Sequence, residues 1–133
     1  NMLFLYLYIN MSSSSLSSSK GICNFLGNKN YVYVLRLEND KYYVGITDCL
    51  EKRLYRHIRG YGSKWTSVNK YVEVVKCYKT LNATFDEKYY TLLYMYLHGI
   101  ENVRGWRWCK ICLNKIDLQY INFYLQKYFL PRY

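Results

Sequence analysis

Two tyrosine segments and the basic segment after them carry the side chains best suited to chemistry. Tyr33 lies in the first, Tyr-Val-Tyr-Val-Leu, and Tyr43 opens the second, Tyr-Val-Gly-Ile-Thr, ten residues later. Arg53 follows after ten more residues, and His57 lies four residues beyond it. Phenols and imidazoles transfer protons, and a planar guanidinium can hold two phosphate oxygens. The spacing therefore indicates a site for cleaving phosphodiester bonds.

The two tyrosine segments are predicted to form a β-hairpin. Apolar runs at 31–37 and 42–47 flank a Glu-Asn-Asp turn, and Asn and Asp tolerate the positive φ angles of tight turns. Pairing of these runs places Tyr33 and Tyr43 on neighbouring strands. Cross-strand aromatic pairs are also ordinary packing, so each phenol has an alternative interpretation as a core residue.

A basic helix is predicted over residues 49–59, with Asp48 as its N-cap and Gly60 after its end. Arg53 and His57 border its apolar stripe and are expected to point toward the edge of the sheet. The stripe repeats every four residues and comprises Leu50, Leu54 and Ile58.

The remaining pattern completes a small α+β domain, a three-stranded antiparallel sheet packed by helices. A loop is expected at 60–66, a third strand at 71–78, and helices at 84–98 and 117–129. The length of 133 residues fits one domain. Its expected parts are a flexible Ser-rich leader at 1–30, the main domain at 31–108 and a helical extension of the same domain at 109–133.

The net charge of +10, from 19 basic and 9 acidic residues, predicts a polyanionic partner. Nucleic acid is the expected partner, and a membrane surface is the weaker alternative. The apolar segment 2–9 is too short to span a bilayer. Met11 is a candidate translation start, which would leave residues 1–10 outside the native protein. Five irregularly spaced cysteines argue for an intracellular, reducing compartment.

The tyrosine motifs and the Arg-His helix together resemble the GIY-YIG nuclease family. Val-Tyr at 32–33 stands for the Ile-Tyr of the first family motif, and Tyr-Val-Gly at 43–45 stands for the second. Tyr31 replaces the usual Gly, a departure that many relatives share. The resemblance covers about residues 31–108. Its Gly-Ile-Glu-Asn-Val-Arg-Gly segment at 99–105 is similar to a subgroup that includes virus-encoded members.

The resemblance implies a one-metal endonuclease that hydrolyses phosphodiester bonds in DNA. A tyrosine would act as general base and an arginine would stabilise the transition state, with either Tyr33 or Tyr43 as the base. A phenol with a pKa near 10 needs roughly two or three units of help to act at neutral pH, from the arginine and the metal. The catalytic residues that the resemblance implies are Tyr33, Tyr43, Arg53, His57 and Asn102.

The metal-binding residue implied by the resemblance is Glu87, with Mg²⁺ or Mn²⁺ as the ion. One carboxylate suffices for Mg²⁺, since phosphate oxygens and water complete its shell. Thr84 and Glu87 also fit a capping box, which would make Glu87 a helix cap, and Asp86 is a nearby substitute ligand. Asn102 has a similar alternative as a residue of the turn after the helix.

Further residues are expected to bind nucleic acid. Arg56 and Arg59 lie farther round the basic helix and suit phosphate contacts. Lys64 and Trp65 lie in a segment that resembles the Gly-x-Lys-x-Thr loop of the family, where they would contact backbone and stack on a base.

Zinc is not expected. Cys109 and Cys112 form half of a zinc site, but structural zinc takes four ligands. His98 or Cys77 would have to complete the set through the fold.

Two other functions remain open at this stage. The first is a non-catalytic nucleic-acid-binding module that kept the fold and charge. The second is a small membrane-associated protein, which would follow if segment 2–9 docks on a membrane. If the chain is a nuclease, a setting in DNA repair or recombination is expected, with a protein partner supplying specificity.

Overall fold

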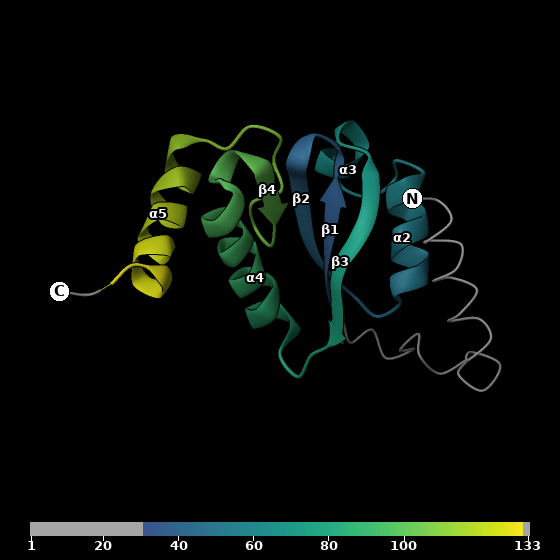
Figure 1. Ribbon diagram of the computed structural model, residues 1–133, viewed down its shortest axis with the longest axis horizontal. Coiled ribbons are helices and arrows are strands. Elements are labelled where there is room, and N and C mark those ends of the chain that lie inside the picture. Colours follow the sequence, from purple (N-terminus) through teal and green to yellow (C-terminus); the bar gives the residue numbers. More distant parts are fainter. Residues whose placement is uncertain (1–30, 132–133) are drawn as a thin grey trace.

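The computed structural model describes residues 31–131, so the predicted leader at 1–30 lies outside the described residues. The chain alternates strands and helices (Figure 1). In order the elements are β1 (Tyr31–Leu37), η2 (Glu38–Asp40), β2 (Lys41–Thr47), α2 (Leu50–Ile58), α3 (Lys64–Val68), β3 (Tyr71–Lys79), α4 (Ala83–His98), η3 (Ile100–Asn102), β4 (Val103–Gly105) and α5 (Lys115–Phe129).

The sheet confirms the α+β class and adds a strand to the prediction. Its order is β3-β1-β2-β4, with β1 antiparallel to both β2 and β3 and with β4 parallel to β2. The predicted three-stranded antiparallel sheet is therefore part of a four-stranded mixed sheet. Strand β4 has only three residues, among them an arginine and a glycine, so its sequence carries no period-2 pattern.

The hairpin between β1 and β2 forms as predicted. Asn39 and Asp40 adopt positive φ angles of 61° and 56°, the left-handed conformation that these two residue types tolerate best. The resulting register pairs Tyr33 with Gly45 and Leu35 with Tyr43. Side chains of alternate residues then point to opposite faces of the sheet.

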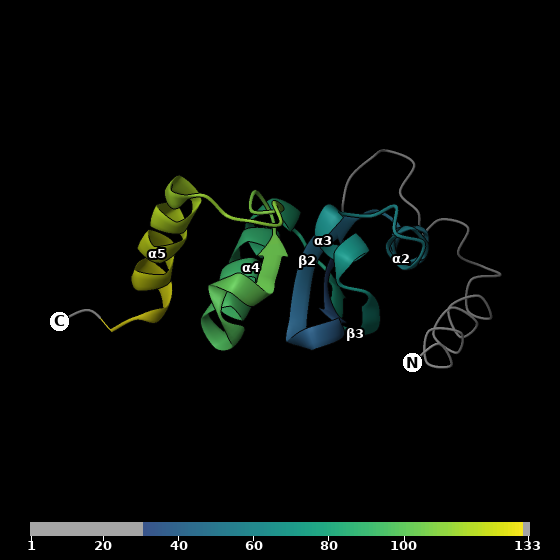
Figure 2. The same ribbon diagram turned by 90° about the horizontal axis from the view of Figure 1, so that it is seen from above.

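Each face of the sheet is covered by helices. One face packs against α2 and α3 through a core of Tyr33, Leu35, Leu37, Tyr43, Leu50, Leu54 and Trp65. The opposite face carries Val32, Val34 and Val44 and packs against the α4 residues Tyr90 and Tyr94. Helix α5 packs on the far side of α4, so both views show the order α5, α4, sheet, α2 (Figures 1 and 2). None of the helices within residues 31–131 is long and apolar enough to cross a membrane.

The basic helix α2 differs from the prediction at both ends. Its N-cap is Cys49 rather than Asp48, and Cys49 makes no side-chain capping bond. Near its end Ile58 is 37% exposed, whereas His57 is only 1% exposed, so the histidine takes the core position expected of the isoleucine. Gly60 follows the helix with φ at 79°, as its predicted closing role requires.

Candidate active site

Tyr33 and Tyr43 lie on the sheet face that α2 and α3 cover. Their rings are 6.3 Å apart between centroids and are both buried. Gly45 faces Tyr33 across the hairpin, and a Cβ atom there would lie 2.4 Å from the Tyr33 hydroxyl. The glycine of the second motif therefore makes the space that the first motif's phenol occupies.

Arg53 and His57 of α2 both reach the Tyr33 hydroxyl. Arg53 Nε donates to Tyr33 Oη at 3.2 Å, and His57 Nε2 lies 2.8 Å from the same oxygen. The His57 ring also meets Tyr43 edge-on, with 5.0 Å between centroids. The four residues that the sequence singled out at its two motifs and its basic helix therefore form one cluster.

Thr66 of α3 extends this cluster, a contact that sequence reasoning missed. Its Oγ1 lies 2.9 Å from His57 Nδ1 and donates to the Ser63 carbonyl at 3.1 Å. With its proton committed there, Thr66 Oγ1 accepts from Nδ1–H, which leaves Nε2 free to accept from Tyr33. The signal was present in the Gly-x-Lys-x-Thr segment, whose threonine sets the histidine tautomer.

The environment keeps the three titratable groups of the cluster neutral. Burial raises the pKa of both phenols, and the Glu87 charge raises them further, while Arg53 lowers them. Burial and the charges of Arg53 and Arg56 lower the pKa of His57 to about 3. The expectation that the site lowers the pKa of a tyrosine is therefore wrong for the free protein, because burial outweighs Arg53.

The buried His57 should make stability fall as the pH is lowered from 6.5. An unfolded chain protonates this histidine near pH 6.5, whereas the folded chain does so near pH 3, so the unfolded state binds more protons between these values. The contribution of His57 to the free energy of unfolding is complete above pH 6.5. Below pH 6.5 the free energy of unfolding falls by up to about 1.4 kcal/mol per pH unit. Urea unfolding at pH 7.5 and pH 5 measures the difference.

The variant His57→Gln is the control for this pH dependence. Glutamine does not titrate. Between pH 7.5 and pH 5 the free energy of unfolding of the variant should therefore fall by about 2 kcal/mol less than that of the parent protein. An equal loss in both proteins would show that other groups cause the pH dependence.

Glu87 is not a helix cap, contrary to one of its two predicted roles. Helix α4 has its N-cap at Asn82, whose side chain accepts from Phe85 N at 3.2 Å. Glu87 therefore lies beyond the first turn, and the predicted capping box does not form. Burial is the main cause of the raised pKa values of Tyr33, Tyr43 and Cys109, and the charge of Glu87 contributes to each of these shifts.

Asp86 faces a different part of the fold. Its Oδ2 accepts from Thr80 Oγ1, and its charge and hydrogen bonding help to raise the pKa of Tyr78 at the end of β3. Of the two adjacent carboxylates, Glu87 is the one whose charge acts on the pKa values of Tyr33 and Tyr43.

The donor set fits a hard, hydrated divalent ion. Within residues 31–131 there is no group of three or more His, Cys, Asp and Glu side chains that could enclose a metal. A single carboxylate such as Glu87 is enough for Mg²⁺, which retains water and takes phosphate oxygens. The cysteine pair is arranged differently, since half-buried Cys109 donates to the Trp106 carbonyl at 3.2 Å and Cys112 is exposed.

Asn102 lies in the turn after α4, and Trp65 is buried rather than exposed in a loop. Asn102 accepts from Lys41 Nζ at 2.5 Å and donates to the His98 carbonyl at 2.7 Å, which matches its alternative role in the turn after α4. Trp65 is 5% exposed, and its indole donates to the Tyr42 carbonyl at 2.9 Å. A tryptophan this buried has no open face for a base, so its predicted stacking role is wrong.

The remaining predicted contacts lie on the surface around the cluster. Arg56, Arg59 and Lys64 are exposed, although Lys64 begins helix α3 rather than lying in a loop. A cavity of about 380 Å³ opens beside Arg53 and is also lined by Lys52 and Arg56. An anion can therefore reach the half-buried Arg53 from a basic surface.

Comparison with known proteins agrees with this geometry. The profile of the GIY-YIG catalytic domain matches residues 29–95, about half of the chain. A UPF0213 protein from Xanthomonas campestris is 40% identical over 45 residues, which are 34% of this chain and 44% of that protein. UPF0213 protein YazA from Bacillus subtilis is 31% identical over 65 residues, which are 47% of this chain and 66% of YazA.

The chain thus spans less than two thirds of the length of these relatives. No solved structure matches it. The profile covers the hairpin, the basic helix and the Glu87 helix, which are the elements that build the cluster. The chain therefore belongs to the GIY-YIG catalytic domain family.

Proposed function

We propose that this chain is a metal-dependent endonuclease that hydrolyses phosphodiester bonds in DNA. The observation that supports this most directly is the chain of contacts from Arg53 to Tyr33 to His57 to Thr66. It joins a phosphate-binding cation to a phenol and a neutral imidazole, with the Glu87 carboxylate acting on the same face. The net charge of +10 suits a polyanionic substrate.

Of the two tyrosines, Tyr33 is the one whose hydroxyl contacts a proton acceptor, His57 Nε2. As the attacking water gives a proton to Tyr33 Oη, the Tyr33 hydroxyl proton can move to His57 Nε2, which Thr66 keeps unprotonated. The water oxygen bonds to phosphorus while the bond to the leaving oxygen breaks. Tyr33 is fully buried in the free protein, so we infer that substrate binding opens its surroundings to this water.

Arg53 contributes charge at the other side of the phenol. Its Nε holds Tyr33, and its remaining N–H groups can bind phosphate oxygens as negative charge builds on them. Glu87 is the residue that would hold the divalent cation, which would supply charge for the phosphate and the leaving oxygen. Tyr43 packs against Tyr33 and His57 and takes a hydrogen bond from Arg53.

A second candidate function is DNA binding without cleavage. The raised pKa values of both tyrosines favour it, because neither phenol is a ready base in the free protein. The resemblance to the catalytic domain and the complete contact chain around Tyr33 weigh against it.

Cleavage of labelled DNA would decide between the two functions. Single-stranded, duplex, flap and branched DNA should be tested with Mg²⁺, with Mn²⁺ and with a chelator. We expect cutting of at least one of these substrates that the chelator abolishes. Binding of the same DNAs without cutting under all conditions would instead establish the non-catalytic module.

A further inference from the structure

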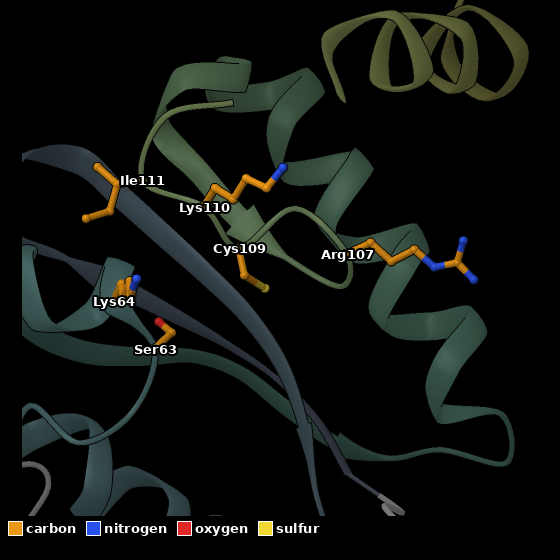
Figure 3. Close-up of a pocket in the computed structure, with 6 residues that line it drawn as sticks. All are labelled: Ser63, Lys64, Arg107, Cys109, Lys110 and Ile111. Carbon is orange, nitrogen blue, oxygen red and sulfur yellow. The ribbon is translucent and has the colours of Figure 1, made fainter. Parts of the chain in front are cut away.

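A cavity that the proposed mechanism does not use lies next to the active site. Its volume is about 460 Å³, and it is lined by Ser63, Lys64, Arg107, Cys109, Lys110 and Ile111. Figure 3 shows Ser63 and Lys64, at the start of α3, facing Cys109 across the gap. The side chains of Lys110 and Arg107 run outward from the loop that follows β4 (Figure 3).

One buried arginine fixes the wall that this loop provides. Arg104 is 4% exposed, and its guanidinium donates to the carbonyls of Lys110 at 2.7 Å and Ile111 at 2.9 Å. The same guanidinium stacks on the Trp65 ring at 4.4 Å. Since Trp65 belongs to α3, Arg104 ties the two walls of the cavity together, so the cavity exists before any ligand binds.

The loop also begins with a tight, paired turn. Gly105 and Trp108 exchange two backbone hydrogen bonds of 3.0 and 2.9 Å, and Trp106 between them has φ at 52°. A left-handed conformation at a bulky residue is uncommon and costs about 1 kcal/mol or more, so the surrounding contacts must hold it in place. The turn presents Arg107 on the surface.

Two residues of the cavity are coupled to the active site. Burial raises the pKa of Cys109; the charge of Glu87 raises it further, and the charges of Arg104 and Arg53 lower it. Ser63 accepts through its carbonyl from Thr66 Oγ1, which in turn contacts His57. A ligand in this cavity would therefore lie beside the groups proposed to act on the phosphate.

The lining combines cations with uncharged side chains. Lys64, Arg107 and Lys110 are the positively charged residues of the lining, which includes no carboxylate. The charged ends of Arg107 and Lys110 lie at its outer side (Figure 3), where Lys110 pairs with Asp117 of α5 at 3.6 Å. Cys109 and Ile111 supply an uncharged surface. A flat run of cations suffices to bind duplex phosphates, whereas a concave site with apolar walls suits a base that has left its stack.

We propose that this cavity binds one unpaired nucleotide of the DNA strand next to the phosphate that is cut. The proposal rests on the proposed function, because it requires DNA at the active site. Residues 107–111 of the lining lie beyond the residues 29–95 that match the GIY-YIG profile, whereas Ser63 and Lys64 lie within them, so the later segment of the chain completes the subsite. It would direct cleavage to junctions of paired and unpaired DNA.

The test compares two flap duplexes that differ only in the unpaired base. One carries a single thymidine flap and the other carries an abasic residue there, so that the number of phosphates is the same. Fluorescence anisotropy with chelator present measures binding without cleavage. We expect the protein to bind the thymidine flap about tenfold more tightly than the abasic flap, because the base leaves water for the uncharged surface of Cys109 and Ile111.

Two variants assign this preference to the cavity. Ile111→Trp fills the cavity without changing the charge, and Ile111 is 42% exposed, so the fold should tolerate it. It should bring the two affinities to within about twofold. Arg107→Ala with Lys110→Ala should weaken binding of the flap more than Lys79→Ala with Lys127→Ala, which removes the same charge elsewhere on the surface.

Each outcome bears on one proposal. Equal binding of both flaps by the parent protein would overturn the nucleotide subsite while leaving the endonuclease intact, if DNA is still cut. A preference that survives in Ile111→Trp would place the base elsewhere and also overturn it. Loss of the thymidine preference in Ile111→Trp would support the subsite. If the parent protein also cut none of the DNAs, the endonuclease proposal would be refuted. Failure to bind any DNA would overturn both.

Discussion

Replacing Arg53 with alanine should lower the single-turnover rate of DNA cleavage by about a hundred- to a thousandfold. The guanidinium is positioned by its bond to Tyr33 and is reached from a basic cavity, so it can meet charge as it develops on the phosphate. Loss of one such preorganised donor typically costs this much in rate. Quenched-flow or manual time courses at saturating enzyme measure it.

Arg56→Ala is the matched control for Arg53→Ala. Arg56 lies on the same helix and carries the same charge, but it is exposed and its predicted role is to contact the DNA backbone. Its loss should weaken binding several-fold and leave the saturated rate nearly unchanged. A residual rate within tenfold of the parent in Arg53→Ala would refute the assigned role.

Arg53→Lys separates charge from geometry. Lysine keeps the positive charge but has no planar fork to hold Tyr33 and a phosphate oxygen together. We therefore expect the lysine variant to be closer to alanine than to the parent. Thermal unfolding should show that both variants are folded, because Tyr33 retains its contact with His57.

The hairpin was predictable because its signals are local. Runs rich in Tyr and Val form both strands, which are buried on both faces, and the Asn-Asp turn adopts the positive φ angles that these residues tolerate. The register then follows from the turn, and the register brings Tyr33 and Tyr43 onto one face. The spacing of Arg53 and His57 on one helix completed the cluster from sequence alone.

The features that were missed depend on contacts between distant segments. Trp65 resembles an exposed loop residue in sequence, but Arg104 stacks on its ring and Tyr42 accepts from its indole. His57 replaces Ile58 in the core because Tyr33 and Thr66 satisfy both of its ring nitrogens. Hydrophobic periodicity predicts that Ile58 faces the core, because the pattern carries no information about the partners of His57.

The pKa values of the tyrosines and of His57 could likewise not be predicted from the sequence. Arg53, a bound metal and basic neighbours were expected to lower the pKa of a phenol, yet in the free protein burial raises both tyrosine pKa values. The free protein therefore holds Tyr33 protonated and His57 neutral.

The capping motif was wrong for a physical reason that bears on Glu87. Asn82 is a better N-cap than Thr84 and lies two residues earlier, so the helix starts sooner and Glu87 is carried beyond the first turn. Adjacent residues of a helix point about 100° apart, so Asp86 and Glu87 have different surroundings. Asp86 meets Thr80, whereas Glu87 acts on the tyrosines. The two carboxylates therefore make a matched pair for mutagenesis.

Glu87→Gln should abolish metal-dependent cleavage, lowering the rate by at least about a thousandfold, because an amide is a poor ligand for a hard divalent ion. Stability should change by less than about 0.5 kcal/mol, since Asn82 caps the helix.

Asp86→Asn is the control for Glu87→Gln. It should show the opposite pattern, with cleavage retained and stability reduced by about 1 kcal/mol through the weakened Thr80 bond. Titration of Mn²⁺ against each variant adds a readout that is independent of turnover: only the Glu87 variant should lose binding. Normal cleavage by Glu87→Gln, or its loss in Asp86→Asn alone, would place the metal elsewhere.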